Sequence, residues 1–100
     1  MATYIATVRF TSEGIDAIRE TTKRATAFKT TASRMGVKVT DIFWTMGPTD
    51  GVIIFDAPND QKATAAMLAL SSRGTVQTTT SRAFRSNEMA KVIAALPKKK

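Results

Sequence analysis

The sequence predicts an α+β fold in which a four-stranded antiparallel sheet carries two long helices on one face. Apolar residues alternate between strand and helix spacing along the chain, in the order β-α-β-β-α-β-α. Two β-rich runs, residues 37–46 and 52–56, flank the segment Gly47-Pro48-Thr49-Asp50-Gly51, which predicts a β-hairpin. The second arm, Val52-Ile53-Ile54-Phe55, is apolar at every position, as is typical of a strand covered on both faces.

The first strand and helix follow from the spacing of apolar residues in the N-terminal third of the chain. Residues 4–10 alternate in polarity, which indicates a strand, and Thr11 or Ser12 is expected to cap a helix that ends at Gly36. The Thr21-Thr22 pair is unfavourable inside a helix, so we expect a kink or a break there. The predicted buried stripe of this helix consists of Ile15, Ile18, Ala25, Phe28, Ala32 and Met35.

The rest of the chain repeats the pattern. In a regular strand the apolar residues Val39 and Ile42 would point to opposite faces of the sheet. This predicts a β-bulge near residues 40–41. Asn59 or Asp60 is expected to cap a second helix, and residues 76–84 form a Thr-rich strand at or near an edge. A short helix from Asn87 to Pro97 follows. Two split βαβ halves of this kind build the ferredoxin-like arrangement, with the first and third strands in the centre.

Length and composition restrict the class of protein. One hundred residues make one domain, residues 1–97, followed by a basic tail, residues 98–100. Cysteine and histidine are both absent, which excludes disulfides, thiolate nucleophiles, His-ligated metals and Ser-His-acid triads. We therefore expect no metal or other cofactor. Membrane spans need about 20 consecutive apolar residues, and none occurs, so we expect a cytoplasmic protein without membrane partners.

The net charge of +7 includes the tail lysines, and without these three residues it is +4. The other basic residues are scattered, which is typical of a solvated surface. The same topology serves the RNA-binding RRM, but its exposed aromatics are replaced here by aliphatic Ile53 and Ile54. No specific nucleic-acid partner is expected, and the tail could bind polyanions only weakly.

Five side chains are candidates for ligand binding, and each has a structural alternative. Asp50 either forms the hairpin turn or presents a carboxylate to a ligand, and Trp44 either lines a pocket or packs in the core or a dimer contact. Asp56 either caps the following turn or faces a polar cavity. Arg9 and Arg82 lie within predicted strands, where a cation must be paired or solvated, so they either form an anion site or reach solvent.

Self-association is the function that the sequence favours. The helices can cover only one face of the sheet, so the other face requires a partner, and we expect a homodimer or higher homo-oligomer with a possible small-molecule ligand. The predicted dimer interface consists of Ile53, Ile54 and Phe55. A cofactor-independent monooxygenase or isomerase is the enzymatic alternative, but no set of polar residues has a spacing that specifies a reaction.

Short motifs that together indicate a known family are spread over nearly the whole chain. They include Tyr4-Ile5-Ala6, Phe10-Thr11, Gly14-Ile15, Lys23-Arg24, Ala27-Phe28-Lys29, Met35-Gly36-Val37, Trp44-Thr45-Met46-Gly47, Asp50, Ala57-Pro58, Leu68-Ala69-Leu70 and Thr80-Ser81-Arg82-Ala83-Phe84. Through these residues the chain resembles the GYD-domain proteins, a family of small bacterial proteins. Thr49 stands where the family signature has tyrosine. The resemblance implies a ferredoxin-like fold that pairs sheet to sheet as a dimeric α+β barrel, and it implies no activity.

Overall fold

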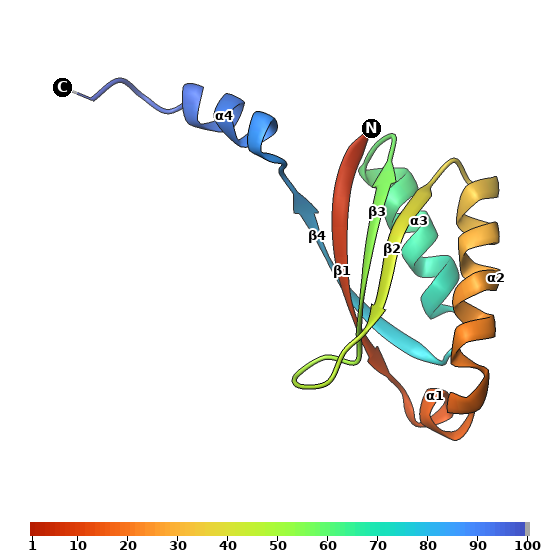
Figure 1. Ribbon diagram of the computed structural model, residues 1–100. Coiled ribbons are helices and arrows are strands. Elements are labelled where there is room, and N and C mark those ends of the chain that lie inside the picture. Colours follow the sequence, from red (N-terminus) through yellow and green to blue (C-terminus); the bar gives the residue numbers. More distant parts are fainter. Residues whose placement is uncertain (100) are drawn as a thin grey trace.

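The computed structural model describes residues 1–99, which contain one four-stranded antiparallel sheet. Its strands are β1 (Ala2–Phe10), β2 (Lys38–Trp44), β3 (Gly51–Ala57) and β4 (Val76–Ala83). The spatial order is β2-β3-β1-β4, so β1 and β3 are central, as predicted. The long helices α2 (Thr21–Arg34) and α3 (Asp60–Ser71) lie on one face of the sheet (Figure 1). The predicted α+β, ferredoxin-like fold is confirmed.

The core lies between this face of the sheet and the two long helices. Alternate residues of each central strand are buried there, because successive side chains of a strand point to opposite faces. Tyr4 of β1 and Phe55 of β3 are stacked, with ring centroids 5.3 Å apart. The buried apolar residues are Tyr4, Ala6, Val8, Phe28, Ala32, Val37, Ile53, Phe55, Ala57, Ala63, Ala66 and Met67.

The opposite face of the sheet carries no helix (Figure 1). Ile54 belongs to this face because its neighbours Ile53 and Phe55 are buried under the helices. Ile5 pairs directly with Ile54, and Phe43 pairs with Val52. We call these four apolar residues, Ile5, Phe43, Val52 and Ile54, the open face.

The predicted break in the first helix is confirmed. A short helix α1 (Ser12–Asp16) and a 3₁₀ turn η1 (Ile18–Glu20) precede α2, which starts at Thr21. Thr11 caps α1, since its Oγ1 accepts a hydrogen bond from the Gly14 amide at 3.1 Å. The expectation that Ile15 and Ile18 are buried is wrong: they are 55% and 38% exposed. The break turns α1 and η1 off the axis of α2, so one helical stripe does not extend through both.

The predicted β-bulge in β2 is also confirmed. The register with β3 shifts between Val39 and Asp41, and Thr40 Oγ1 donates to the Ile54 carbonyl at 3.0 Å. Val39 pairs with Phe55 and Ile42 pairs with Ile53. Both side chains therefore face the helices, because the extra residue of the bulge brings the apolar residues of the two halves of β2 to the same face of the sheet.

The C-terminal helix α4 (Ser86–Ala94) extends away from the rest of the molecule beyond β4 (Figure 1). None of its residues is buried. Exposed fractions are 45% for Met89, 42% for Val92, 56% for Ile93 and 64% for the following Leu96. Lys100, the last residue of the predicted tail, lies outside the described residues. Within residues 1–99 there is no helix with the length and apolar character to cross a membrane.

Candidate functional site

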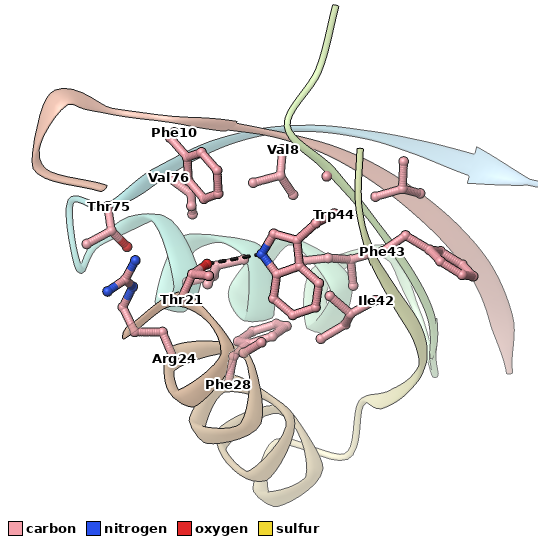
Figure 2. Close-up of a pocket in the computed structure, with 15 residues that line it drawn as sticks. Val8, Phe10, Thr21, Arg24, Phe28, Ile42, Phe43, Trp44, Thr75 and Val76 are labelled. Atoms are coloured by element: carbon pink, nitrogen blue, oxygen red, sulfur yellow. Dashed lines mark hydrogen bonds between the residues drawn. The ribbon is translucent and has the colours of Figure 1, made fainter. Parts of the chain in front are cut away.

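An apolar cavity lies between α2 and the end of the sheet where β2 meets β3 (Figure 2). We call it the α2 cavity. Its volume is about 60 Å³, and Arg24 is the one charged residue among those that line it. The lining includes Val8, Phe10, Thr21, Arg24, Ala25, Phe28, Ile42, Trp44, Leu70 and Val76. The side chain of Phe43 points away from the other labelled side chains, as expected for a residue of the open face (Figure 2).

Trp44 forms a half-exposed wall of the α2 cavity. It pairs with Gly51 and is 46% exposed. The indole N–H donates to Thr21 Oγ1 at 3.1 Å, which ties the end of β2 to the first residue of α2 (Figure 2). Thr21 takes this position because the helix restarts there. The helix break predicted from the Thr pair therefore helps to shape the cavity.

Arg24 projects from the first turns of α2 into the cavity wall. Its Nη1 donates to the Ala17 carbonyl at 2.7 Å, a group exposed by the break between α1 and α2. Its Nη2 is buried and has no acceptor among the described residues. A buried donor without an acceptor costs about 1–3 kcal/mol, and more when the group is charged. Arg24 is thus the one cation at the cavity, and its unused donor, Nη2, is enclosed by protein atoms and does not face the cavity space.

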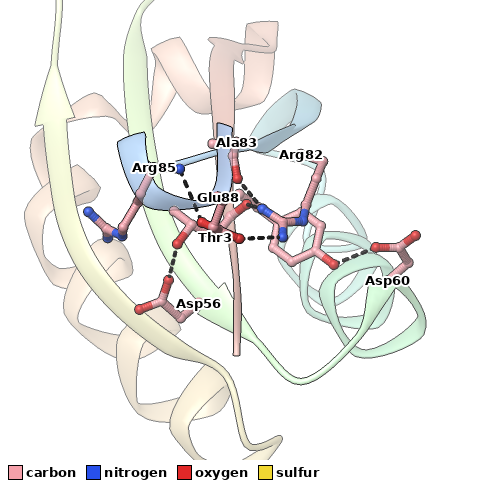
Figure 3. Close-up of polar contacts among 8 residues, drawn as sticks. Thr3, Asp56, Asp60, Arg82, Ala83, Arg85 and Glu88 are labelled. Atoms are coloured by element: carbon pink, nitrogen blue, oxygen red, sulfur yellow. Dashed lines mark hydrogen bonds and ion pairs between the residues drawn. The ribbon is translucent and has the colours of Figure 1, made fainter. Parts of the chain in front are cut away.

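A second group of polar residues lies at the other end of the helix side of the sheet (Figure 3). The Tyr4 hydroxyl donates to Asp60 Oδ1 at 2.5 Å, and Arg82 Nη2 donates to Glu88 Oε2 at 2.9 Å. The Arg82 guanidinium carbon lies 5.8 Å from the centroid of the Tyr4 ring and 4.7 Å from that of Phe84. We call Tyr4, Asp60, Arg82 and Glu88 the Tyr4 cluster.

Tyr4, Asp60 and Arg82 of the Tyr4 cluster line a groove between α3 and β4 with a volume of about 450 Å³. The polar side chains of the Tyr4 cluster are largely paired with one another. Arg82 also donates to the carbonyls of Thr3, at 3.3 Å, and of Ala83. The hydrogen bond from Arg82 lowers the pKa of Glu88 below 4.5, and the bond from the Arg85 amide adds to this. The cluster joins the end of β4 to the start of α4.

The hydrogen bond to Asp60 raises the pKa of Tyr4 above 10.0, and burial adds to the shift. Because the folded pKa exceeds the ordinary value, this bond stabilises the fold fully below pH 10, and its contribution is lost as the pH rises through the folded pKa. Tyr4 is the one tyrosine of the chain, so ultraviolet absorbance titrates it alone. We expect Asp60→Asn to move the midpoint back toward 10.0. Identical midpoints in the two proteins would contradict the proposed cause.

A known protein family matches most of the chain. Residues 4–93 match the family model of the GYD domain. The chain belongs to the GYD domain family. No curated protein matches it. The matched residues run from β1 into α4, so they include both the α2 cavity and the Tyr4 cluster. The resemblance that the sequence predicted is thus confirmed over nearly the whole chain.

In this GYD domain the loop between β2 and β3 is held by backbone hydrogen bonds. Gly47 has a φ of +119°, a conformation that favours glycine. Asp50 Oδ2 accepts from the Phe10 amide at 2.8 Å, and the Asp50 amide donates to the Val8 carbonyl at 2.8 Å. Thr49, at the signature position, accepts from Thr45 Oγ1 through its carbonyl at 2.8 Å. The side chain and the amide of Asp50 thus tie the loop to β1.

The five predicted ligand-binding residues do not form one site in the single chain. Trp44 lines the α2 cavity, and Arg82 belongs to the Tyr4 cluster. Arg9 donates to the Pro48 carbonyl at 2.8 Å, beside the loop that contains Asp50. Asp56 Oδ1 accepts from Thr3 Oγ1 at 2.7 Å (Figure 3). Arg9 and Asp50 thus lie together at the hairpin end of the sheet, and Asp56 and Arg82 lie near its opposite end. Each of the five side chains makes at least one hydrogen bond to the protein itself.

The predicted interface residues also divide between the two faces. Ile53 is 5% exposed and Phe55 is fully buried, so both belong to the core of one chain. Of the three predicted interface residues, only Ile54 lies on the open face. The strict alternation of a strand makes this division necessary, so the three side chains cannot all face the same side of the sheet.

The residues that sequence reasoning missed are Thr21, Arg24 and Asp60. Thr21 was expected only to break the helix, and Asp60 only to cap one. Both are paired with aromatic residues remote in the sequence, Thr21 with Trp44 and Asp60 with Tyr4. Among residues 1–99 no group of three or more acidic side chains is placed to hold a metal ion.

Proposed function

We propose that this GYD domain is a self-associating binding module in which two copies pair through their open faces. The observation that carries the proposal is the open face, a group of apolar side chains on β1, β2 and β3. No helix covers this side of the sheet (Figure 1). Phe43 is 53% exposed and Ile5 is 38% exposed. Contiguous exposed apolar side chains on a small domain mark interaction sites, because burying them against a partner is favourable.

The arrangement of side chains on this surface fits a dimer contact. Ile5 and Ile54 are a direct cross-strand pair at its centre, and Phe43 and Val52 form the next pair toward the hairpin loop. Arg9 lies toward one end of β1, Lys38 lies opposite Asp56 toward the other end, and Asp41 of the edge strand β2 lies opposite Ile54. An apolar centre with a polar rim is the usual composition of a protein interface.

Helix α4 supports assembly independently of the open face. It extends from the body and exposes Met89, Val92 and Ile93. A short helix in water is marginally stable unless one side packs against other residues. A second copy of the chain could provide that packing, because α4 follows the edge strand β4 and projects beyond the core of its own chain.

Binding is a better proposal than catalysis because the polar groups near the cavities mostly satisfy one another. In the Tyr4 cluster, Tyr4 is bonded to Asp60 and Arg82 to Glu88. The raised pKa of Tyr4 keeps the phenol protonated, which makes it a poor base at neutral pH. Catalytic acid–base groups work best with a pKa near the operating pH. We therefore propose no reaction for this site.

Replacing Ile54 with Asp tests the proposal. We expect the wild-type protein to sediment as a dimer or larger species of the 10.8 kDa chain, and Ile54→Asp to sediment as a folded monomer. A carboxylate on each open face would be desolvated by pairing, which is unfavourable without a partner charge. Leu68→Asp is the matched control, since Leu68 is 64% exposed on α3 and should leave the mass unchanged.

Two results would contradict the proposal. One is a wild-type protein that remains monomeric at high concentration. The other is a dimer that survives Ile54→Asp but dissociates with Leu68→Asp, since that result would place the contact on the helix side of the sheet. Circular dichroism of each variant checks that the fold is retained.

A further inference from the structure

We propose that the α2 cavity binds a small aliphatic carboxylate, with the carboxylate on Arg24 and the hydrocarbon chain among the apolar walls. The inference combines two observations on one site. The walls are almost wholly apolar, and Arg24, the one cation that lines them, is in no ion pair among residues 1–99. A ligand with one acceptor-rich anionic end and one apolar end satisfies both.

Arg24 has the unsatisfied charge that such a ligand would neutralise. The ion pairs among the described residues are Lys23 with Glu20 and Arg82 with Glu88, so no carboxylate of the protein reaches Arg24. Its Nη1 is held by the Ala17 carbonyl, which fixes the orientation of the guanidinium plane. A carboxylate is the group that best matches the donor geometry of a guanidinium, and the hydrogen bond is strengthened by charge on both partners.

The remaining lining residues restrict the ligand to a monoanion. Arg24 is the one charged residue at the cavity, and the neighbouring walls are side chains such as Phe28, Ile42 and Val76. A phosphate or a dicarboxylate would bring additional charge against these apolar groups, and desolvating a charge without a partner is unfavourable. A monocarboxylate leaves only hydrocarbon to be accommodated there.

The volume of the cavity sets the length of the hydrocarbon chain. About 60 Å³ is well below the roughly 150 Å³ of a cavity that binds benzene. A short chain of about three or four carbons is therefore the expected occupant, since longer chains must extend past Trp44 into solvent. Butyrate is the simplest probe of this class.

The site lies within one chain and does not depend on the proposed pairing. Arg24, Thr21 and Phe28 all come from α2, on the opposite side of the sheet from the open face (Figures 1 and 2). Phe43 and Val52 of the open face also contribute to the lining, whereas Ile54 does not. The Ile54→Asp variant should therefore bind butyrate as the wild type does. Failure of the dimer proposal and failure of this one are separate results.

Trp44 provides a direct measurement of binding. It is the one tryptophan of the chain, and its half-exposed indole lines the cavity and bonds to Thr21. Titration with butyrate should give a saturable change in its fluorescence at millimolar concentration. Butanol and butylammonium, which have the same chain with a neutral or a cationic head, should bind at least tenfold more weakly. Equal response to all three, or no saturable response to carboxylates of two to six carbons, would overturn the proposal.

Arg24→Met is the decisive variant, because Met keeps much of the apolar stem and removes the charge. We expect butyrate affinity to fall at least tenfold, while Arg19→Met, a change at an exposed arginine of η1, should leave it unchanged. Unaltered butyrate binding by a folded Arg24→Met protein would refute the assignment. Equal losses in both variants would show only a general effect of charge and would refute it as well.

Amide NMR of the wild-type protein locates the ligand without any substitution, so the test stands even if Arg24→Met does not fold. Butyrate should shift resonances of cavity residues such as Thr21, Arg24 and Trp44. Shifts confined to Lys98 and Lys99 would show nonspecific attraction to the basic tail and would overturn the proposal.

Discussion

Ile53→Asp is expected to unfold the protein. Ile53 is 5% exposed in the core, and it pairs with Ala6, which is fully buried. A carboxylate there loses its water without gaining a partner, and we expect a loss of more than about 4 kcal/mol. Domains of this size are stable by about 5–15 kcal/mol, so this change removes much or all of the free energy of unfolding. Urea denaturation followed by circular dichroism measures it.

The adjacent substitution, Ile54→Asp, is the matched control for this result. The residue type, the strand and the new side chain are the same, and only the face of the sheet differs. Measured as a monomer, Ile54→Asp should cost at most about 1 kcal/mol, as surface changes usually do. If both variants unfolded to the same degree, the assignment of opposite faces to these two residues would be wrong.

Gly14→Ala is expected to have the second largest effect on stability. A Cβ atom at this position would lie 2.1 Å from the Thr75 carbonyl oxygen, a backbone atom that cannot move aside alone. The same oxygen accepts the Thr11 amide hydrogen bond at 3.1 Å, so relieving the clash disturbs the contact between α1 and the start of β4. Overpacking of this kind costs about 1–3 kcal/mol.

Thermal unfolding is a suitable measurement for Gly14→Ala. For a domain of this length each kcal/mol lowers the midpoint by roughly 4–8 °C. Ser12→Ala is the control, because Ser12 is an exposed residue of the same short helix and should change stability by no more than about 0.5 kcal/mol. A Gly14→Ala protein as stable as the control would contradict the close approach of α1 to Thr75.

Local chemistry was sufficient to predict most of the fold. The hairpin, the bulge near Thr40 and the helix break at Thr21 each depend on residues within a few positions, so their signals are contained in short segments. The prediction failed for Ile15 and Ile18, where one helical stripe was extended through the break. Once the axis changes, spacing along the chain no longer determines which side chains share a face.

The candidate sites were less predictable because they depend on contacts between remote residues. The Tyr4–Asp60 bond joins residues 56 positions apart, and no local pattern distinguishes Asp60 from an ordinary helix cap. Arg24 acquires its role from the Ala17 carbonyl, which becomes available only where α1 ends. Asp50 and Arg9 were predicted as possible ligand-binding residues, and each bonds to a backbone group about 40 positions away in the chain, which no local pattern indicates.

The bulge in β2 has a consequence for the solubility of the protein. Both outer strands, β2 and β4, remain at the edges even if two sheets stack face to face, so unpaired amide and carbonyl groups are available to further chains. The bulge at Thr40 bends the edge strand β2, and the Thr40 side chain bonds to Ile54. The bend interrupts the straight row of backbone groups that fibril growth requires. The other edge strand, β4, presents Gln77, Thr79 and Ser81, which offer an incoming strand little hydrophobic contact. The bulge in β2 and the polar side chains of β4 thus protect the molecule against amyloid-like polymerisation.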